Sequence, residues 1–249
     1  MENDGYREVF GARGGRYDDA MRRWPAVRDE EFAFVLDLAE PVTGETLVDI
    51  PSGGGYLGAH LPDGVDLVGV EVSDEFVERG REHEVTMFAT GLEAAGLPAA
   101  SADAVVSIAG MHHEDDHGSL FAAWRRLLRP GGRLVAADVV AGSAEARFLD
   151  GFVGEWTSTG HAGHYFGDGL AQLGEAAGYV DIAVHDGRYH WWADDDAMLA
   201  AFCTSLFGLE DVTADLVLDA IEAGPGLTRE PDRVGLRWGL RALVARSAG

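Results

Sequence analysis

The sequence predicts an α/β protein in which a mostly parallel β-sheet carries helices on both of its faces. Three observations lead to this prediction. Short apolar runs alternate with segments of helical periodicity along the first 140 residues, a glycine-rich turn at Gly53-Gly54-Gly55 directly follows the first apolar run, and Pro130-Gly131-Gly132 separates a helical segment from the fifth run. Strands that alternate with helices are joined by right-handed crossovers, which make neighbouring strands parallel.

Helical and strand periodicities assign the individual elements. Residues 6–17 are rich in Gly and Arg and are expected to form a loop or a mobile arm. Apolar side chains at helical spacing predict a helix over residues 28–39, which Pro41 stops. Ser73 can cap a helix that runs to about Glu82. Further helices are expected over residues 117–128, most of 143–177, 194–207 and 213–223. Strands are expected at residues 46–50, 65–70, 85–89, 103–108, 133–140, 179–184 and 236–246, with the last one antiparallel to its neighbours.

The charge and composition exclude several classes of partner. Asp and Glu number 43 against 19 basic residues, all of them Arg, which gives a net charge of −24. Such a surface repels nucleic acid phosphates and anionic lipids. No apolar run approaches the roughly 20 residues that span a bilayer, no secretory signal is expected at the polar N-terminus, and the single Cys203 permits no internal disulfide. We therefore expect a cytoplasmic protein whose acidity reflects either a high-GC or salt-adapted source or the attraction of a cationic substrate.

The glycine-rich turn predicts a nucleoside-binding site. Residues 53–58 follow the first strand with the spacing G-x-G-x-x-G, in which glycines allow a tight turn and close approach of a ligand to the backbone. A helix that begins there would direct free N–H groups at an anion. Glu71 ends the next strand, 22 residues after Asp49, where a carboxylate can accept hydrogen bonds from both ribose hydroxyls.

Asp49 distinguishes between candidate nucleosides. A nicotinamide dinucleotide would place its pyrophosphate on the turn, and a carboxylate directly before the turn disfavours that. An ammonium group, such as that of the methionine part of S-adenosylmethionine, suits Asp49 better.

Four ordered motifs make the chain resemble the class I S-adenosylmethionine-dependent methyltransferase family, most closely over residues 30–140. The motifs are Leu47 to Gly55, Val68-Gly69-Val70-Glu71, Leu97-Pro98 through Val106, and Leu127 to Leu134. The resemblance implies a Rossmann-like, seven-stranded, mostly parallel sheet with extra N-terminal helices and lid insertions. It also implies a single methyltransferase domain over residues 1–249, with a helical lead-in or cap (1–45), a cofactor-binding core (46–140), and acceptor-side helices and final strands (141–249).

The resemblance further implies a set of cofactor-binding residues. These are Asp49, Pro51, Ser52, Gly53, Gly55, Glu71, Val72, Thr90, Gly91, Leu92, Ala109 and Gly110. Pro51 departs from the family's pattern, because many members have a glycine there and proline removes an N–H. The acid that often contacts the adenine after the third strand is also missing from its usual place, so Thr90, the backbone around Leu92, or Glu93 is expected to make that contact.

The segment Met111 to His117 follows the fourth strand, which in this family faces the transferred methyl group. Three interpretations of its histidines stay open: one histidine packs near the cofactor while the acids cap the next helix, a histidine acts as a base or orients the acceptor, or several histidines bind a metal. His112 and His113 are the candidates for a catalytic role because they lie nearest the strand end. No metal ligand is assigned.

Two other segments are candidate covers for the acceptor. The loop Ser158 to Phe166 interleaves glycines with His161, His164 and Tyr165, which suits a lid, with His161 as a further catalytic candidate. In the N-terminal arm, Tyr17 is a candidate substrate contact, and Arg16 or Arg13 could pair with a carboxylate of the cofactor or substrate. The aromatic run 189–192 is interpreted as structural, although aromatic faces can also hold a cation or a flat ring.

The sequence therefore favours an enzyme that uses S-adenosylmethionine to methylate a small molecule by in-line transfer. Two alternatives stay open: a non-catalytic partner protein on the same fold, and an enzyme that uses the bound cofactor for other chemistry or a nicotinamide oxidoreductase. The sequence identifies neither the acceptor nor the oligomeric state.

Overall fold

The structure is a computed structural model that describes residues 5–248. Within that range, seven strands form one sheet in the order β3-β2-β1-β4-β5-β10-β6. They are β1 (Thr46–Asp49), β2 (Asp66–Glu71), β3 (Thr86–Ala89), β4 (Ala102–Ile108), β5 (Leu128–Asp138), β6 (Tyr179–Asp186) and β10 (Arg241–Ser247). Strands β1 to β5 are parallel, and β10 runs antiparallel to both β5 and β6. The predicted seven-stranded, mostly parallel sheet is confirmed.

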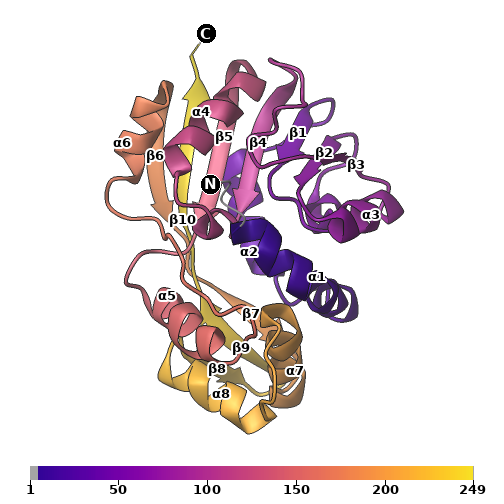
Figure 1. Ribbon diagram of the computed structural model, residues 1–249, viewed down its shortest axis with the longest axis vertical. Coiled ribbons are helices and arrows are strands. Elements are labelled where there is room, and N and C mark those ends of the chain that lie inside the picture. Colours follow the sequence, from indigo (N-terminus) through magenta and orange to yellow (C-terminus); the bar gives the residue numbers. More distant parts are fainter. Residues whose placement is uncertain (1–4, 249) are drawn as a thin grey trace.

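Helices cover both faces of this sheet (Figure 1). The helices are α1 (Gly5–Arg23), α2 (Asp29–Ala39), α3 (Asp74–Glu82), α4 (His117–Leu127), α5 (Ala144–Phe148), α6 (Leu170–Ala176), α7 (Asp196–Phe207) and α8 (Ala214–Ala223), with short helical turns η1 (Tyr56–His60), η2 (Met111–His113) and η3 (Leu149–Val153). Side chains alternate between the two faces, so Leu47 packs with α2 whereas Val48 packs with α4. Ser73 accepts a hydrogen bond from the Phe76 N–H and caps α3, as the sequence predicted.

A second sheet lies below the first in Figure 1, and α5, α7 and α8 surround it. Within residues 5–248 its strands are β7 (Tyr189–Ala193), β9 (Arg233–Trp238) and β8 (Leu227–Glu230), in that order and antiparallel. The prediction of one final strand over residues 236–246 is wrong, because the chain leaves β9 at Gly239 and enters β10 in the other sheet. A Cβ on Gly239 would lie 2.6 Å from the Gly187 carbonyl oxygen, so two chain segments cross closely there.

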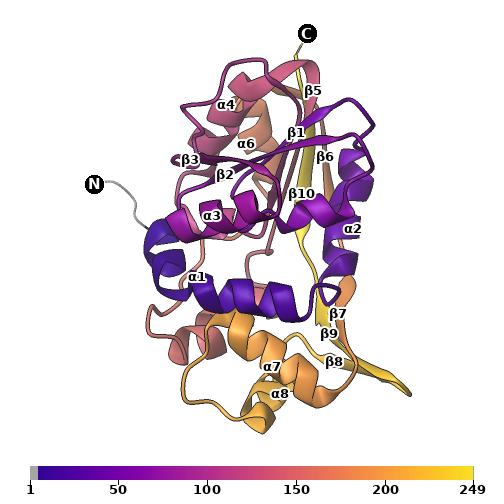
Figure 2. The same ribbon diagram turned by 90° about the vertical axis from the view of Figure 1, so that its right-hand side faces the viewer.

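The N-terminal arm is a helix, so the predicted loop over residues 6–17 is also wrong. The glycines in this region permit close packing of α1 against α3: a Cβ on Gly15 would lie 3.2 Å from Glu75 Oε1. Helical spacing then places three aromatic rings in a row along α1. The Phe10 ring lies between those of Tyr6 and Tyr17, with centroids 4.4 Å and 5.9 Å away. Figure 2 shows α1 lying between α3 and α7, where it bridges the two layers. No helix over residues 5–248 has the length and apolar character that would let it cross a membrane.

Candidate functional site

The glycine turn joins β1 to η1 at the carboxyl edge of the large sheet. Gly53 and Gly55 adopt φ values of 53° and 76°, in the left-handed region that favours glycine. The Ser52 N–H donates to the Val70 carbonyl, and the Gly53 N–H donates to Glu71 Oε2 at 3.0 Å. These bonds fix the turn against the end of β2. The expected α-helix after the turn is only the 3-10 turn η1, so the helix N-terminus expected there is wrong.

Glu71 is fully buried at the end of β2, and both of its carboxylate oxygens accept hydrogen bonds. Oε1 accepts from the N–H groups of Val72 (2.7 Å) and Ser73 (2.9 Å), and Oε2 accepts from the Gly53 N–H and, at 3.0 Å, from the Tyr6 hydroxyl. Burial raises the pKa of Glu71 to about 7, although these hydrogen bonds act in the opposite direction. The carboxyl group therefore changes charge near neutral pH.

A cavity, here called the turn cavity, lies between the glycine turn and α1. Its lining residues are Tyr6, Phe10, Tyr17, Arg28, Phe32, Asp49, Pro51, Ser52, Gly53, Tyr56, Leu57, Phe76, Ile108, Ala109 and Gly110. Asp49 is 4% exposed at the end of β1, and burial together with the nearby charge of Glu71 raises its pKa well above the usual value. A buried acid on the wall of a cavity is a suitable partner for a cationic ligand group.

Pro51 and Gly110 are matched to each other across the turn cavity. The Ile50–Pro51 peptide bond is cis. A Cβ on Gly110 would lie 2.3 Å from Pro51 Cγ, so the pyrrolidine ring occupies space that only a glycine leaves open. The departure at Pro51 therefore has a structural partner in the loop after β4.

The sequence-predicted cofactor residues divide into two sets. Six of them line the turn cavity: Asp49, Pro51, Ser52, Gly53, Ala109 and Gly110. The remaining six, which are Gly55, Glu71, Val72, Thr90, Gly91 and Leu92, do not line it in the described part of the chain. Glu71 is covered by Tyr6, through the hydrogen bond to its hydroxyl.

The segment after β3 holds the candidates for an adenine contact. The Leu92 carbonyl accepts a hydrogen bond from Trp124 Nε1 at 2.7 Å, which engages the backbone there. A Cβ on Gly91 would lie 2.7 Å from Glu93 Oε2, so the Glu93 carboxylate lies over Gly91. Glu114, which sequence analysis did not single out, is half-buried, and burial raises its pKa. The charge of Glu93 also raises the pKa of Glu114, so Glu114 lies near this segment.

Helix α1 is fastened over the turn cavity by polar contacts. The Tyr56 hydroxyl donates to Asp18 Oδ1 at 2.9 Å, and Arg79 Nε lies 3.2 Å from Asp18 Oδ2. The Tyr17 hydroxyl bonds the Arg28 guanidinium. Together with the Tyr6–Glu71 bond, these contacts tie α1 to the glycine turn, to α3 and to the start of α2.

A second cavity, here called the histidine cavity, adjoins the turn cavity. Its lining residues are Phe10, Tyr17, Arg28, Ala109, His112, His113, Val139, Leu149, Val153, His161, Trp191, Leu206, Phe207 and Trp238. The first four of these also line the turn cavity, so the two cavities share a wall. The lining of the histidine cavity combines aromatic and apolar side chains with three imidazoles.

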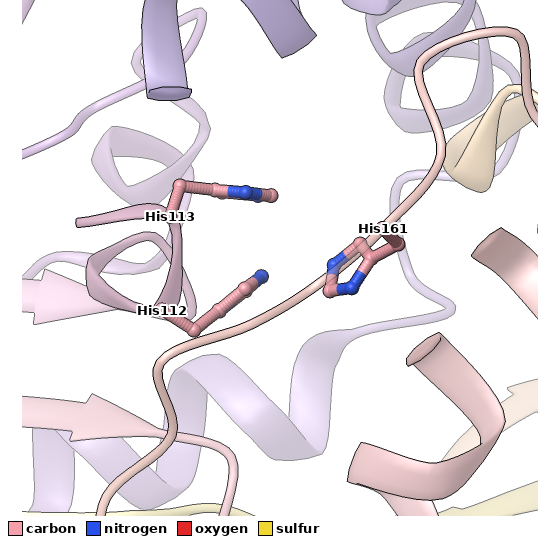
Figure 3. Close-up of side chains that lie close together, drawn as sticks. All are labelled: His112, His113 and His161. Carbon is pink, nitrogen blue, oxygen red and sulfur yellow. The ribbon is translucent and has the colours of Figure 1, made fainter. Parts of the chain in front are cut away.

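The three imidazoles come from two separate segments and converge, as Figure 3 shows. His112 and His113 belong to η2, after β4, and His161 belongs to the loop after η3. The ring centroids of His112 lie 4.2 Å from His113 and 5.3 Å from His161. Each of the three can offer one nitrogen such that all three atoms lie within 4.8 Å of one another.

Carboxylates support two of these rings from behind. His112 Nδ1 lies 2.7 Å from Oδ1 of Asp138, which is fully buried and also accepts from the His112 backbone N–H. His161 Nδ1 lies 3.0 Å from Oδ1 of Asp150, which also accepts from the Tyr165 hydroxyl at 2.6 Å. Although partial burial acts to raise it, hydrogen bonds from Tyr165 and His161 hold the pKa of Asp150 below its usual value.

The other predicted substrate residues are placed differently. Tyr17 lines both cavities, and Tyr165 stacks on His112 with ring centroids 5.7 Å apart. Arg16 instead donates to the carbonyl oxygens of Gly208 and Leu209 and lines neither cavity. His164 is exposed, and its backbone N–H donates to the His112 carbonyl. The side chain of Arg13 lies outside the described part of the chain.

Sequence reasoning missed several residues that line the histidine cavity. Arg28 is 4% exposed, pairs with Glu31 and lies over the Trp191 ring, 5.4 Å from its centroid. Arg28 stands at the start of a predicted helix, and nothing in the sequence apart from its charge indicates that it lines a cavity. Trp191 comes from the run interpreted as structural, and Phe207 and Trp238 come from the end of α7 and from β9. Only the topology brings these aromatic residues together.

Part of the chain is similar to known methyltransferases. Residues 48–136 match the family model described as a methyltransferase domain. A demethylmenaquinone methyltransferase of Beutenbergia cavernae is 30% identical over 135 residues, which make up 50% of this chain and 56% of that protein. The chain thus spans about half the length of the curated relatives it matches.

Solved structures are similar over more of the chain. The complex between the Haloferax volcanii Trm112 methyltransferase activator and a methyltransferase matches with a TM-score of 0.66 at 19% identity, over 98% of this chain and 97% of that one. Haemonchus contortus phosphoethanolamine N-methyltransferase 2, in complex with S-adenosyl-L-methionine, matches with a TM-score of 0.58 at 16% identity, over 88% of this chain and 52% of that one. At these identities the likeness shows a shared fold.

Proposed function

Residues 48–136 match a family model described as a methyltransferase domain, and from that premise we propose that the protein transfers a methyl group from S-adenosylmethionine to a small molecule bound in the histidine cavity. The observation that supports this most strongly is the wall that the two cavities share at Phe10, Tyr17, Arg28 and Ala109. A donor in one cavity and an acceptor in the other would face each other across it.

Residues in and beside the turn cavity fit S-adenosylmethionine. Asp49, on the cavity wall, can hold the ammonium group of the methionine part, and the buried Glu71 carboxylate can accept hydrogen bonds from ribose hydroxyls once the Tyr6 hydroxyl leaves it. The left-handed glycines of the turn keep side chains out of the ligand's path. The cofactor supplies an electrophilic methyl group, and the residues of the turn cavity would fix the position of that group.

The histidine cavity fits a small acceptor with a flat or apolar body. Trp191, Phe207 and Trp238 offer aromatic surface. Within the described residues, the buried indole N–H of Trp238 has no hydrogen-bond partner, and an acceptor oxygen could accept from it. His112, His113 and His161 would act on the nucleophilic group of the acceptor, and α1 would exclude water from the shared wall.

Calorimetry followed by a transfer assay tests this function. Titration with S-adenosylmethionine and with S-adenosylhomocysteine should each show one site per chain, and NAD should show none. A panel of aromatic and aliphatic alcohols, acids and amines should then contain a compound whose methylation releases S-adenosylhomocysteine. A Leu149→Trp variant, which fills the histidine cavity alone, should keep cofactor binding and lose transfer. Absence of heat with either nucleoside would contradict the proposal.

Cofactor affinity should increase with pH through neutrality. The pKa of Glu71 is raised to about 7 by burial, that of its neighbour Asp49 is also raised, and Tyr6 donates to Glu71. A cationic ligand and ribose hydroxyls favour the ionised acid. The dissociation constant of the cofactor should therefore increase by up to tenfold for each pH unit that the pH falls below 7, and it should be constant near pH 8. Calorimetry from pH 6 to 8 checks this, and a profile that is flat over this range would contradict it.

The stability of the ligand-free protein should depend on pH in the opposite sense. The folded-state pKa of Glu71 lies above the unfolded value of 4.5, so the folded protein binds the proton more tightly. The contribution of this group to stability is therefore present below about pH 4.5 and is lost as pH rises to about 7. Bound cofactor should remove this loss, which thermal unfolding with and without S-adenosylhomocysteine can measure.

A Tyr6→Phe substitution should speed cofactor binding. The Tyr6 hydroxyl occupies Glu71 Oε2, so this bond must break before a ribose hydroxyl can replace it. A hydrogen bond to a charged group contributes about 1.5 kcal/mol, so its removal should raise the association rate of the cofactor about tenfold in stopped-flow measurements. Tyr179→Phe is the matched control, because that buried hydroxyl donates to the Phe121 carbonyl and lines neither cavity in the described residues. Equal rates in Tyr6→Phe and wild type would refute this role for α1.

A further inference from the structure

We propose that His112, His113 and His161 bind a divalent transition-metal ion in the histidine cavity. The ion would have an open coordination position that an oxygen of the acceptor could occupy. This role toward the acceptor rests on the proposed function, whereas the metal site itself does not. The two histidines of η2 are adjacent in sequence, and the third follows His113 by 48 residues, so the fold and not a spacing motif assembles the group.

The distances suit three-histidine coordination after a small adjustment. Each ring can offer one nitrogen within 4.8 Å of the other two. Tetrahedral coordination with metal–nitrogen bonds of about 2.0–2.1 Å brings such nitrogens to about 3.3 Å. The donor nitrogens must therefore move closer together by about 1.5 Å at most when the ion binds. Figure 3 shows the three rings arranged around one space, with His161 opposite the η2 pair.

The carboxylates behind two rings are the arrangement that metal-binding histidines require. Asp138 accepts hydrogen bonds from the backbone N–H groups of His112 and Val139, so it acts as an acceptor and His112 Nδ1 must donate to it. Asp150 accepts from the Gly163 N–H and from the Tyr165 hydroxyl in the same way, so His161 Nδ1 donates to it. A proton fixed on Nδ1 makes Nε2 the nitrogen with a lone pair for the metal, and the carboxylate increases its basicity.

The backbone holds the two histidine segments in register. The His164 N–H donates to the His112 carbonyl at 2.7 Å, and the Phe166 N–H donates to the Val139 carbonyl at 3.0 Å. The segment that follows His161 is therefore fixed to η2 and to the end of β5. A site that is organised before the ion arrives loses less conformational entropy on binding.

The ligand set selects the class of metal. Three imidazoles without a carboxylate suit Zn²⁺, Fe²⁺, Co²⁺ or Ni²⁺ and disfavour Mg²⁺ and Ca²⁺, which require oxygen ligands. Three protein ligands leave at least one position open, as in sites where a metal binds water or substrate. An acceptor whose hydroxyl or carboxyl oxygen occupies that position would be held beside the shared wall.

Titration of the metal-free protein tests the site. The full chain, treated with a chelator and dialysed, is titrated with ZnCl₂ by calorimetry and with CoCl₂ by visible absorption. Because the net charge of −24 attracts cations without specificity, the buffer contains about 0.5 M NaCl to screen exposed acids. We expect one ion per chain, a Co²⁺ spectrum with d–d bands typical of low coordination number, and no saturable binding of Mg²⁺.

Variants separate this site from adventitious binding. His112→Ala and His161→Gln should each weaken Zn²⁺ binding about 100-fold or more, because each removes a ligand. His164→Ala and His185→Ala are matched controls, since both side chains are exposed and neither belongs to the group of three, and their affinity should equal that of wild type. Because His161 lies on a loop, the His161→Gln variant should give the circular dichroism spectrum of a folded chain. It therefore tests the site even if His112→Ala fails to fold.

The outcomes distinguish this inference from the proposed function. No stoichiometric binding in 0.5 M NaCl, or equal losses in the ligand and control variants, would overturn the metal site. If S-adenosylmethionine still binds in that case, the proposed function stands without the metal. One Zn²⁺ per chain in a protein that binds no S-adenosylmethionine would support the metal site and contradict the proposed function.

Discussion

Replacing Glu71 with glutamine is expected to weaken the binding of S-adenosylmethionine by about 30-fold or more. The side chain is fully buried, and its two oxygens accept hydrogen bonds from the glycine turn, from the residue after β2 and from Tyr6. A hydrogen bond to a charged group contributes about 1.5–3 kcal/mol, and 1.4 kcal/mol is a factor of ten in affinity. Glutamine keeps the shape but removes the charge and one acceptor. Calorimetry at pH 8 measures the change.

Asp66→Asn is the matched control for Glu71→Gln. Asp66 is an exposed acid at the start of the same strand, so its neutralisation changes the net charge equally without touching either cavity. Its affinity for S-adenosylmethionine should equal that of wild type. In the glutamine variant, the dependence of affinity on pH between 6 and 8 should also flatten. Wild-type affinity in Glu71→Gln would remove Glu71 from the cofactor site.

Replacing Glu31 with glutamine is expected to lower the free energy of unfolding by about 3–5 kcal/mol. Glu31 is fully buried in α2 and pairs with Arg28, which is 4% exposed. Its other oxygen accepts from the Tyr189 hydroxyl and from Trp191 Nε1, both at 3.1 Å. Although burial acts to lower it, the charge of Glu31 holds the pKa of Arg28 above its usual value. Without Glu31 the guanidinium is a buried charge that has lost its carboxylate partner, which is strongly destabilising.

Urea and thermal unfolding measure the effect of Glu31→Gln. A loss of this size should lower Tm by about 10 °C in a chain of this length. Asp29→Asn is the control, because its exposed side chain lies on the first turn of the same helix and its removal should change stability by less than about 0.5 kcal/mol. A Glu31→Gln protein as stable as the control would show that the Arg28–Glu31 pair contributes nothing.

The parts of the fold that sequence could predict are those with local signals. Each strand of the parallel sheet is a short apolar run closed by a turn, and Ser73 carries the capping signal for α3 within three residues. Helix α1 lacked such a signal, because glycines usually disfavour a helix. In the structure, these glycines allow α1 to pack closely against α3. The division between β9 and β10 was also hidden, because alternation continues through Gly239 and only the crossing with Gly187 reveals the break.

The same distinction applies to the candidate site. Asp49, the glycine turn and Glu71 lie within 23 residues, so their spacing predicted a nucleoside site. The histidine cavity depends on contacts between distant segments. His161 was named as a candidate, but its convergence with His112 follows from the loop's backbone bonds to η2. Arg28 gains its role from Glu31, Tyr17 and the distant Trp191, which local periodicity does not link.

A crystal structure of the protein grown with S-adenosylhomocysteine tests the central claim most directly. We expect the ribose hydroxyls within hydrogen-bond distance of Glu71, the Tyr6 hydroxyl displaced from Oε2, and the amino group beside Asp49. The sulfur atom should face the shared wall at Ala109, toward His112. A nucleoside bound elsewhere, or one that leaves the Tyr6–Glu71 bond intact, would contradict the account.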